Sequence, residues 1–237
     1  MKTRRLIGSV LAIALAATSL GVVATAAAPA QAVETVQTRI VPGIDGRPEF
    51  SSYSKQPAYG DTISVYVDVQ AFVNGAWKNI YNGSVTVTEQ LAGSATPTVV
   101  ASNTSAYVSD SFKARGNATY TVSYSGGTGE YPAVNYAPVQ ATYAGPAVSR
   151  KLTTKTISGK HAGFKGKLSP ATKTKITVLK KKGKKFKKFK VLRSKKNGRF
   201  TVVLPAPRRG KFHWRIIFAG DSRFVGSVIQ GTTYKGF

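Results

Sequence analysis

Apolar and polar residues alternate with a period of two over several short stretches of this chain. The clearest stretches are residues 63–69, 120–124 and 214–218, where Val, Ile and aromatic residues alternate with Thr, Ser, Asp and other polar residues. This alternation predicts β-strands with one buried face and one polar face. No stretch after residue 32 follows a helical period, so we expect no helix longer than two turns.

Turn signals separate the alternating stretches. They are Asn74-Gly75, Asn82-Gly83, Gly126-Gly127, Lys182-Gly183 and Asn197-Gly198. Glycine and asparagine supply the positive φ angles that tight hairpins require. Short strands that are joined by regular turns predict an all-β, antiparallel sandwich architecture.

An internal repeat divides the chain. Residues 117–126 align with residues 211–220 at a constant offset of 94, which also aligns Val134 with Val228, and Val85–Val87 align with Ile176–Val178 at an offset of 91. A repeat at this scale predicts two copies of one fold. We therefore expect one domain over 33–147, with an extended beginning, and a second over 148–237, joined at Gly145–Val148.

The first 32 residues have the layout of a secretory signal peptide. Lys2, Arg4 and Arg5 precede an apolar stretch from 6 to 23, and Ala30-Gln31-Ala32 matches a cleavage site. A retained anchor is the weaker alternative, and no later stretch approaches the ~20 apolar residues of a spanning helix. The chain has no cysteine. We expect a secreted or extracellular bacterial protein without disulfides, held at the cell wall by charge if at all.

Residues 148–237 resemble the Ig-like β-sandwich modules that are repeated in secreted actinobacterial proteins. The resemblance depends on a basic strand, a Lys-Gly turn and a returning strand, followed by Asn197-Gly198-Arg199-Phe200, Gly210 to Trp214, and Gly220-Asp221-Ser222-Arg223-Phe224. It is weaker over 57–147, where Ser125-Gly126-Gly127 replaces the Gly-Asp loop. The resemblance implies two tandem Ig-like sandwiches with an accessory role, and it carries over no catalytic residue.

Positive charge is concentrated in the second half of the chain. Residues 148–237 hold 26 Lys and Arg against one acid, Asp221, whereas residues 33–147 hold six bases and eight acids. A field of this strength attracts polyanions and raises encounter rates with them. Thirteen of the bases lie between Lys173 and Lys196, which predicts a cationic hairpin.

We predict that this hairpin binds anionic polymers. The predicted binding residues are Lys180, Lys181, Lys182, Lys184, Lys185, Lys187, Lys188, Lys190, Arg193, Lys195 and Lys196, with Phe186 and Phe189 as candidate stacking groups. The plainer interpretation is a solvated face that discourages edge pairing, but a few lysines suffice for that role. Lysine dominates over arginine, and lysine is suited to diffuse phosphate or sulfate contacts.

Catalytic and metal-binding chemistry is not indicated. His213 lies on the strand face opposite Trp214 and is expected to be a half-exposed strand residue, and His161 lies in a loop with no acid nearby in sequence. The acid Asp221 is expected to form a salt bridge or cap a turn rather than bind metal. We expect no enzyme, no cofactor and no metal, and we expect Trp77 to pack inside its sandwich.

Three functions remain open at this stage. The first is electrostatic binding of cell-wall or surface polyanions, such as teichoic-type phosphates, acidic polysaccharide or anionic lipid. The second is a structural or adhesive surface protein whose first domain binds a partner. The third is extracellular nucleic-acid binding, which an exposed Phe186–Phe189 pair would favour and a buried pair would disfavour. The sequence assigns neither a ligand nor an oligomeric state.

Overall fold

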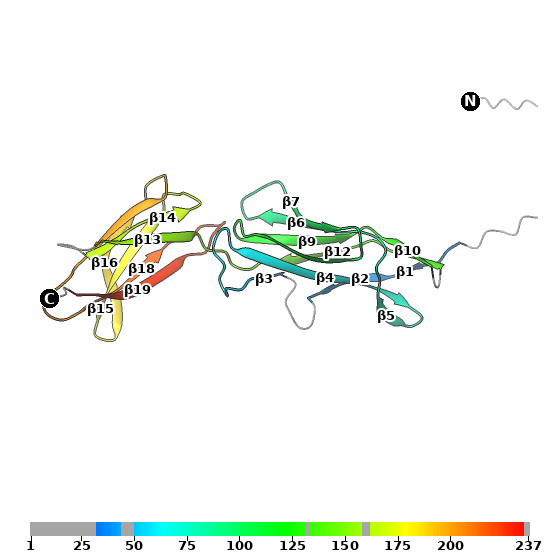
Figure 1. The fold of residues 1–237 in the computed structure, drawn as a ribbon, viewed down its shortest axis with the longest axis horizontal. Helices are drawn as coiled ribbons and strands as arrows, with labels where there is room; N and C mark the ends of the chain where they lie inside the picture. Colours follow the sequence, from blue (N-terminus) through cyan, green and yellow to red (C-terminus); the bar gives the residue numbers. More distant parts are fainter. Residues whose placement is uncertain (1–31, 44–49, 131–132, 158–161, 235–237) are drawn as a thin grey trace, which may run out of the picture. The chain divides into compact units, whose positions relative to one another are not determined.

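The computed structural model describes residues 32–43, 50–130, 133–157 and 162–234 (Figure 1). The predicted signal peptide, except for Ala32, and His161 lie outside these residues. Within the described ranges the protein is all-β, with no helix, as the alternation predicts. Accordingly, the described part of the chain contains no helix with the length and apolarity needed to cross a membrane.

The first half of the chain forms three sheets. β4 is the central strand of a five-stranded sheet with β2, β3, β5 and β8, a second sheet has the order β12-β9-β6-β7, and a small third sheet has the order β1-β11-β10. The strands are β1 (Thr35–Val36), β2 (Thr38–Pro42), β3 (Phe50–Ser51), β4 (Thr62–Val73), β5 (Ala76–Asn79), β6 (Val85–Leu91), β7 (Thr98–Asn103), β8 (Tyr107–Lys113), β9 (Ala118–Tyr124), β10 (Gly127–Glu130), β11 (Ala133–Tyr136) and β12 (Val139–Ala144).

The second half forms two sheets. One has the order β13-β14-β17 and the other has the order β16-β15-β18-β19, with antiparallel pairing throughout. The strands are β13 (Lys151–Ile157), β14 (Ala162–Ser169), β15 (Lys175–Lys182), β16 (Lys185–Arg193), β17 (Arg199–Leu204), β18 (Phe212–Phe218) and β19 (Ser227–Thr233).

The alternating residues of the sequence form the cores of these sheets. Ile63, Val65, Val67 and Val69 on β4 are fully buried, in one cluster with residues of β6 and β9. In the second half, β14 and β17 share a cluster with β15 and β18, so the two sheets enclose one core. The polar residues between the buried ones face outward, as the period of two predicts.

The two four-stranded sheets share order and register. Val87 pairs with Val122 in the first, and at the repeat-equivalent positions Val178 pairs with Ile216 in the second. The register also shifts at equivalent points, after Val87 in one sheet and after Val178 in the other. The repeat in the sequence therefore corresponds to a repeated strand arrangement.

The alignment of Val134 with Val228 is wrong. Val139 lies opposite Tyr124 in the first half, whereas Ser227 lies opposite Phe218 in the second, so the first connection is six residues longer. The extra residues belong to the β10–β11 hairpin, which pairs with β1. Two-residue periodicity looks alike in every strand, and for this reason the sequence alone did not reveal the insertion.

The Gly-Asp loop of the second half is a hydrogen-bonded turn. Asp221 Oδ1 accepts from the backbone N–H groups of Arg223 and Phe224, and Asp221 Oδ2 lies 2.6 Å from Arg150 Nη2. Burial alone would raise the pKa of Asp221, but the hydrogen bond and the charge of Arg150, together with the two backbone hydrogen bonds, lower it overall. The expectation of a salt bridge and a turn cap is confirmed.

This loop packs against the first half of the chain. Phe224 is 1% exposed and belongs to the core cluster that contains β4, β6 and β9. Asn117 donates its backbone N–H to Arg223 O at 2.7 Å, and its side-chain Oδ1 accepts from Val148 N at 2.9 Å. A fragment that began after the predicted linker would expose Phe224, so binding experiments require residues 33–237 together.

Candidate anion-binding site

The lysine-rich segment forms the β15–β16 hairpin. Gly183, with φ of +57°, and Lys184 make the two-residue turn, because Lys182 pairs with Lys185. A positive φ at the first central position of such a turn is the conformation that glycine adopts at low cost. Away from the turn, Lys181 pairs with Phe186 and Lys180 with Lys187.

The lysines divide between the two faces of the hairpin. Lys180, Lys182, Lys185 and Lys187 share the face that carries Ile176 and Val178 into the core, but they extend beyond it into solvent. Lys181 and Lys188 share the opposite face, where Lys188 lies across from Leu179. All six side chains are exposed. The hairpin therefore presents positive charge in every direction around its turn.

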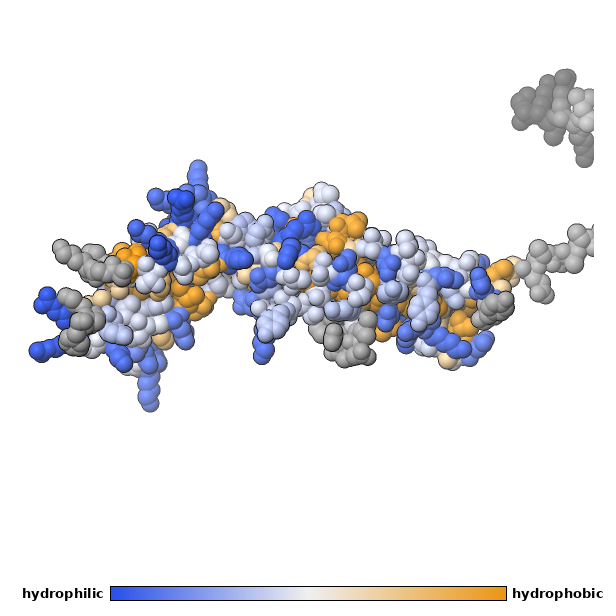
Figure 2. Space-filling view, viewed as in Figure 1, coloured by the Kyte–Doolittle hydropathy of each residue, from blue (hydrophilic) through white to orange (hydrophobic). Residues whose placement is uncertain are grey.

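No carboxylate of the described chain offsets this charge. The two salt bridges among the described residues are Arg115–Glu89 and Arg150–Asp221, and neither involves a hairpin residue. Arg208, Arg209 and Lys211 add charge in the connection that leads into Phe212, whose ring contacts that of Phe189 at 5.4 Å between centroids. Figure 2 shows hydrophilic side chains projecting from the part of the molecule formed by β13–β19.

Lys190 differs from the other lysines of the predicted site. Phe189 is the extra residue at the register shift, and this shift places Lys190 opposite Val178 on the core-facing side. Lys190 is half-buried and donates to the backbone carbonyl of Val203. Burial lowers the pKa of Lys190. The side chain of Lys190 is therefore committed to the protein and is a poor candidate for contact with a ligand.

Phe186 and Phe189 have different surroundings. The guanidinium carbon of Arg215 lies 4.3 Å from the centroid of the half-buried Phe186 ring and covers one of its faces. Phe189 is 43% exposed and lies edge-to-face with Phe212. The structure thus contains neither an exposed Phe pair nor a buried one, and Phe189 is the more exposed of the two rings.

The last part of the predicted site belongs to a different surface. Arg193, at the end of β16, and Lys195, in the connection to β17, line an open groove of about 720 Å³, whereas Lys196 is exposed in the same connection. The other lining residues are Thr153, Thr154, Lys155, Lys165, Gly166, Lys167, Leu192, Arg199, Phe200 and Thr201. We call this surface the β14 groove.

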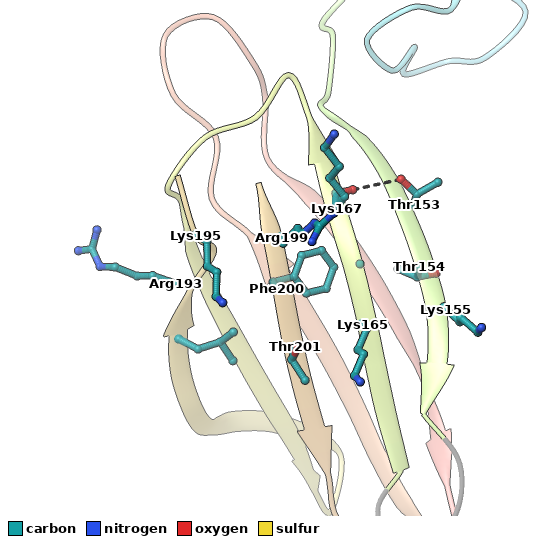
Figure 3. A pocket seen from close by; sticks show the side chains of 12 residues that line it. Thr153, Thr154, Lys155, Lys165, Lys167, Arg193, Lys195, Arg199, Phe200 and Thr201 are labelled. Atoms are coloured by element: carbon teal, nitrogen blue, oxygen red, sulfur yellow. Dashed lines mark hydrogen bonds between the residues drawn. The ribbon is translucent and has the colours of Figure 1, made fainter. Parts of the chain in front are cut away.

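Strand register organises the β14 groove. Lys167 lies between Thr153 and Arg199 on neighbouring strands, and Lys165 lies between Lys155 and Thr201. These six side chains are exposed, on the face opposite the core residues Leu168 and Phe200. Figure 3 shows Arg199 beside the ring of Phe200, with Lys167 and Lys165 extending in opposite directions along β14 and with Arg193 and Lys155 pointing away to either side.

Sequence reasoning missed four cations of the β14 groove, namely Lys155, Lys165, Lys167 and Arg199. Lys165 and Lys167 have the spacing of two that places side chains on one strand face, and this signal was present in the sequence. Their meeting with Arg199 depends on the β14–β17 pairing, which no local pattern reveals. The predicted site therefore divides into a hairpin and a groove.

The other candidate residues behave as structural side chains, with one exception. His213 is exposed and its Nδ1 lies 2.8 Å from Thr232 Oγ1, while Trp214 is buried, as expected. No group of three or more metal-binding side chains occurs among the residues that the structure describes. Trp77 does not pack inside the sandwich: it lies half-exposed on β5 beside Phe72, with Arg39 4.3 Å above its ring.

Two sequence comparisons were informative only in finding no match. No family model matches the chain, and no curated protein matches it. The functional argument therefore depends on the residues and their geometry.

Proposed function

We propose that this protein is a secreted, non-catalytic binding protein whose cationic β15–β16 hairpin adheres to anionic polymers of the bacterial surface. Residues 1–32 would direct export and be removed, leaving two tandem Ig-like sandwiches over 33–147 and 148–237. The shared strand order and register shifts of the four-stranded sheets support the tandem arrangement. The order β16-β15-β18-β19 against β13-β14-β17 agrees with an Ig-like sandwich.

The observation that carries the proposal is the pairing of lysine with lysine across the hairpin. Lys180 lies opposite Lys187 and Lys182 opposite Lys185, with no ion pair to either strand among the described residues. Like charges directly opposite one another destabilise a ladder. An anionic polymer removes this repulsion and releases its own counterions, which drives binding without any chemical step.

A direct test compares three forms of residues 33–237, namely the wild type and two variants. The hairpin variant carries Lys184→Gln, Lys185→Gln, Lys187→Gln and Lys188→Gln, and a dispersed variant carries Lys55→Gln, Lys78→Gln, Lys151→Gln and Lys173→Gln. All eight lysines are exposed and both variants lose four charges. On immobilised polyphosphate the hairpin variant should elute at distinctly lower salt than the dispersed variant. Equal elution would mean that total charge, and not the hairpin, determines binding.

One observation favours a second function, in which the first half of the chain binds a partner. Trp77 and Phe72 form a tilted ring pair at 5.4 Å on an outer sheet face, and Arg39 lies over Trp77. Gln70 and Asn79 lie beside them and hydrogen-bond at 2.9 Å. A partly exposed ring pair flanked by amides suits a neutral, ring-stacking ligand. In that case the hairpin would act as a tether, and Trp77→Ala would abolish partner binding without changing retention on polyphosphate.

A further inference from the structure

We infer that the β14 groove is a second anion-binding site, which takes a segment of one linear phosphodiester chain and recognises its phosphates rather than any base. The inference builds on the proposed polyanion binding but does not require the hairpin. Its four principal cations are Lys165, Lys167, Lys195 and Arg199, which line the same groove.

Charge complementarity is the first argument. Every ionisable residue that lines the β14 groove is Lys or Arg, and no carboxylate lines it. None of these cations takes part in a salt bridge among the described residues. Lys167 and Arg199 lie directly opposite one another, so their Cβ atoms are about 5 Å apart. A bound anion between these side chains would relieve their mutual repulsion.

The shape of the β14 groove is the second argument. Gly166 lies under the ring of Phe200: a Cβ atom at Gly166 would be 2.6 Å from Phe200 Cζ and 2.4 Å from Thr153 O. Residue 166 therefore has to lack a side chain on the Phe200 side of the sheet, and on the opposite face the backbone of β14 forms the floor between Lys165 and Lys167. The groove volume of about 720 Å³ lies in the range of sites for small ligands, so it takes a short segment of one chain.

The spacing of the cations indicates a repeating ligand. Lys165 and Lys167 are two residues apart on an extended strand, which separates them by about 6.6 Å along β14. Arg199 adds a guanidinium fork, which binds phosphate oxygens in pairs, and Thr201 adds a hydroxyl beside Lys165. Two lysines at this separation on one strand fit neighbouring charges of an extended polymer better than a compact anion.

The absence of free aromatic surface distinguishes this site from a base-reading one. Phe200 is the one aromatic residue in the lining of the β14 groove, and it is 5% exposed because it packs against Phe218 in the core. Nucleic-acid sites for single strands hold bases by stacking them on exposed rings. The groove offers no ring to a base, so nucleotides and base-free units should bind it alike.

The test measures binding of residues 33–237 to a fluorescent abasic phosphodiester oligomer and to oligothymidylate of equal length. A groove variant carries Lys165→Gln, Lys167→Gln, Lys195→Gln and Arg199→Gln, and the hairpin and dispersed variants serve as matched controls. These four side chains are exposed, so the substitutions should leave the fold intact, which circular dichroism and thermal melting verify. We expect the groove variant to bind the abasic oligomer about tenfold or more weakly than the dispersed variant.

Lysine footprinting locates the contact directly. Reductive methylation followed by mass spectrometry should show that the abasic oligomer protects Lys165, Lys167 and Lys195, while Lys151 and Lys173 stay reactive. This readout uses the wild-type chain, so it remains decisive if the groove variant folds poorly. Unchanged labelling of all three groove lysines would overturn the inference.

The outcomes separate this inference from the proposed function. Loss of binding in the groove variant alone would support an anion site in the β14 groove and refute one on the β15–β16 hairpin. Loss in the hairpin variant alone would have the opposite meaning. Loss in both supports both sites, and equality of all three variants refutes both. Oligothymidylate that binds about tenfold or more tightly than the abasic oligomer would overturn phosphate-only recognition, since stacking contributes about 1–3 kcal/mol per base.

Discussion

Lys180 lies directly opposite Lys187 on the β15–β16 ladder, on the face of the hairpin that also carries Lys182 and Lys185. Each such pair costs a few tenths to about 1 kcal/mol relative to neutral residues. The hairpin without a bound anion is therefore destabilised by charge repulsion. A strand pair with a purely structural role would be more stable with neutral or oppositely charged residues at these positions. This repulsion links the stability of the protein to the presence of anions.

The hairpin variant should be at least as stable as the wild type without anions, because Gln at 184, 185, 187 and 188 removes repulsion. Millimolar polyphosphate at matched ionic strength should raise the melting temperature of the wild type, since anions bind the folded cluster better than the unfolded chain. The variant should respond less. Thermal melts of residues 33–237 with and without polyphosphate provide the comparison. A variant that unfolds more easily in every buffer would identify these lysines as packing residues.

Lys190 should make stability depend on pH. Burial lowers its pKa in the folded protein, so the unfolded chain binds more protons than the native state between the lowered value and the ordinary value of 10.5. The free energy of unfolding must then rise as the pH rises through this window. The Lys190→Met variant lacks this contribution. The stability of the wild type minus that of Lys190→Met should therefore increase as the pH rises from neutral toward the ordinary pKa of 10.5.

Denaturant unfolding of both proteins over this pH range measures the difference. Subtracting the variant cancels the titration of the other lysines, which is common to both proteins. A difference that is constant with pH would show that Lys190 titrates like a solvent-exposed lysine.

Asp221→Asn should lower the free energy of unfolding by about 0.5–1 kcal/mol, the range for a partly exposed ion pair, because it weakens the Gly-Asp loop. Asparagine keeps the oxygen that accepts from the backbone of residues 223 and 224 but loses the charge that faces Arg150. Because the folded pKa of Asp221 lies below its ordinary value, the contribution is present above that value and is lost as the pH falls through the folded pKa. The stability gap between wild type and Asp221→Asn should close in acid, and a gap that widens there would contradict the assignment.

Arg115→Met should destabilise the protein by about 3–5 kcal/mol, because it leaves a buried carboxylate without its cation. Glu89 is 1% exposed, and its Oε2 lies 2.6 Å from Arg115 Nε. The Tyr120 hydroxyl donates to Oε1 at 3.2 Å, and burial, then the charge of Glu89, raise the pKa of Tyr120. Tyr120→Phe should cost about 1.5–3 kcal/mol, because its hydroxyl donates to a charged carboxylate.

The double variant Arg115→Met, Glu89→Leu is the control for this pair. Replacing both partners with apolar groups removes the unpaired charge and should recover much of the lost stability. Chemical denaturation of the variants gives the values. A double variant that is less stable than Arg115→Met would indicate that packing, rather than charge, dominates at this position.

Much of the fold follows from local pattern. The buried residues of β4, β9 and β18 are the alternating apolar positions of the sequence, and the Asn74-Gly75 pair adopts the positive φ angles, 54° and 74°, that its hairpin requires. Pairing between distant strands does not follow from local pattern. The β10–β11 insertion, the burial of Phe224 in the first core and the Glu89–Arg115 pair each depend on contacts between residues far apart in the chain.

The candidate site was predictable to the extent that it is contiguous in sequence. The hairpin around Gly183 lies where its lysine run and its turn signal place it. The register shift at Phe189 could not be anticipated, and it is this shift that turns Lys190 toward the core. The β14 groove collects cations from four strands and a connection, so only the folding of distant strands together brings them to one surface.

The salt dependence of binding tests the central claim most directly. The affinity of residues 33–237 for polyphosphate should fall about a thousandfold or more between 50 and 200 mM salt if about six to eight phosphates are neutralised. The hairpin variant should show a slope of log affinity against log salt that is shallower by about 3, and the dispersed variant should keep the wild-type slope. A slope that the four hairpin substitutions leave unchanged would contradict the assignment of the polyanion site to the β15–β16 hairpin.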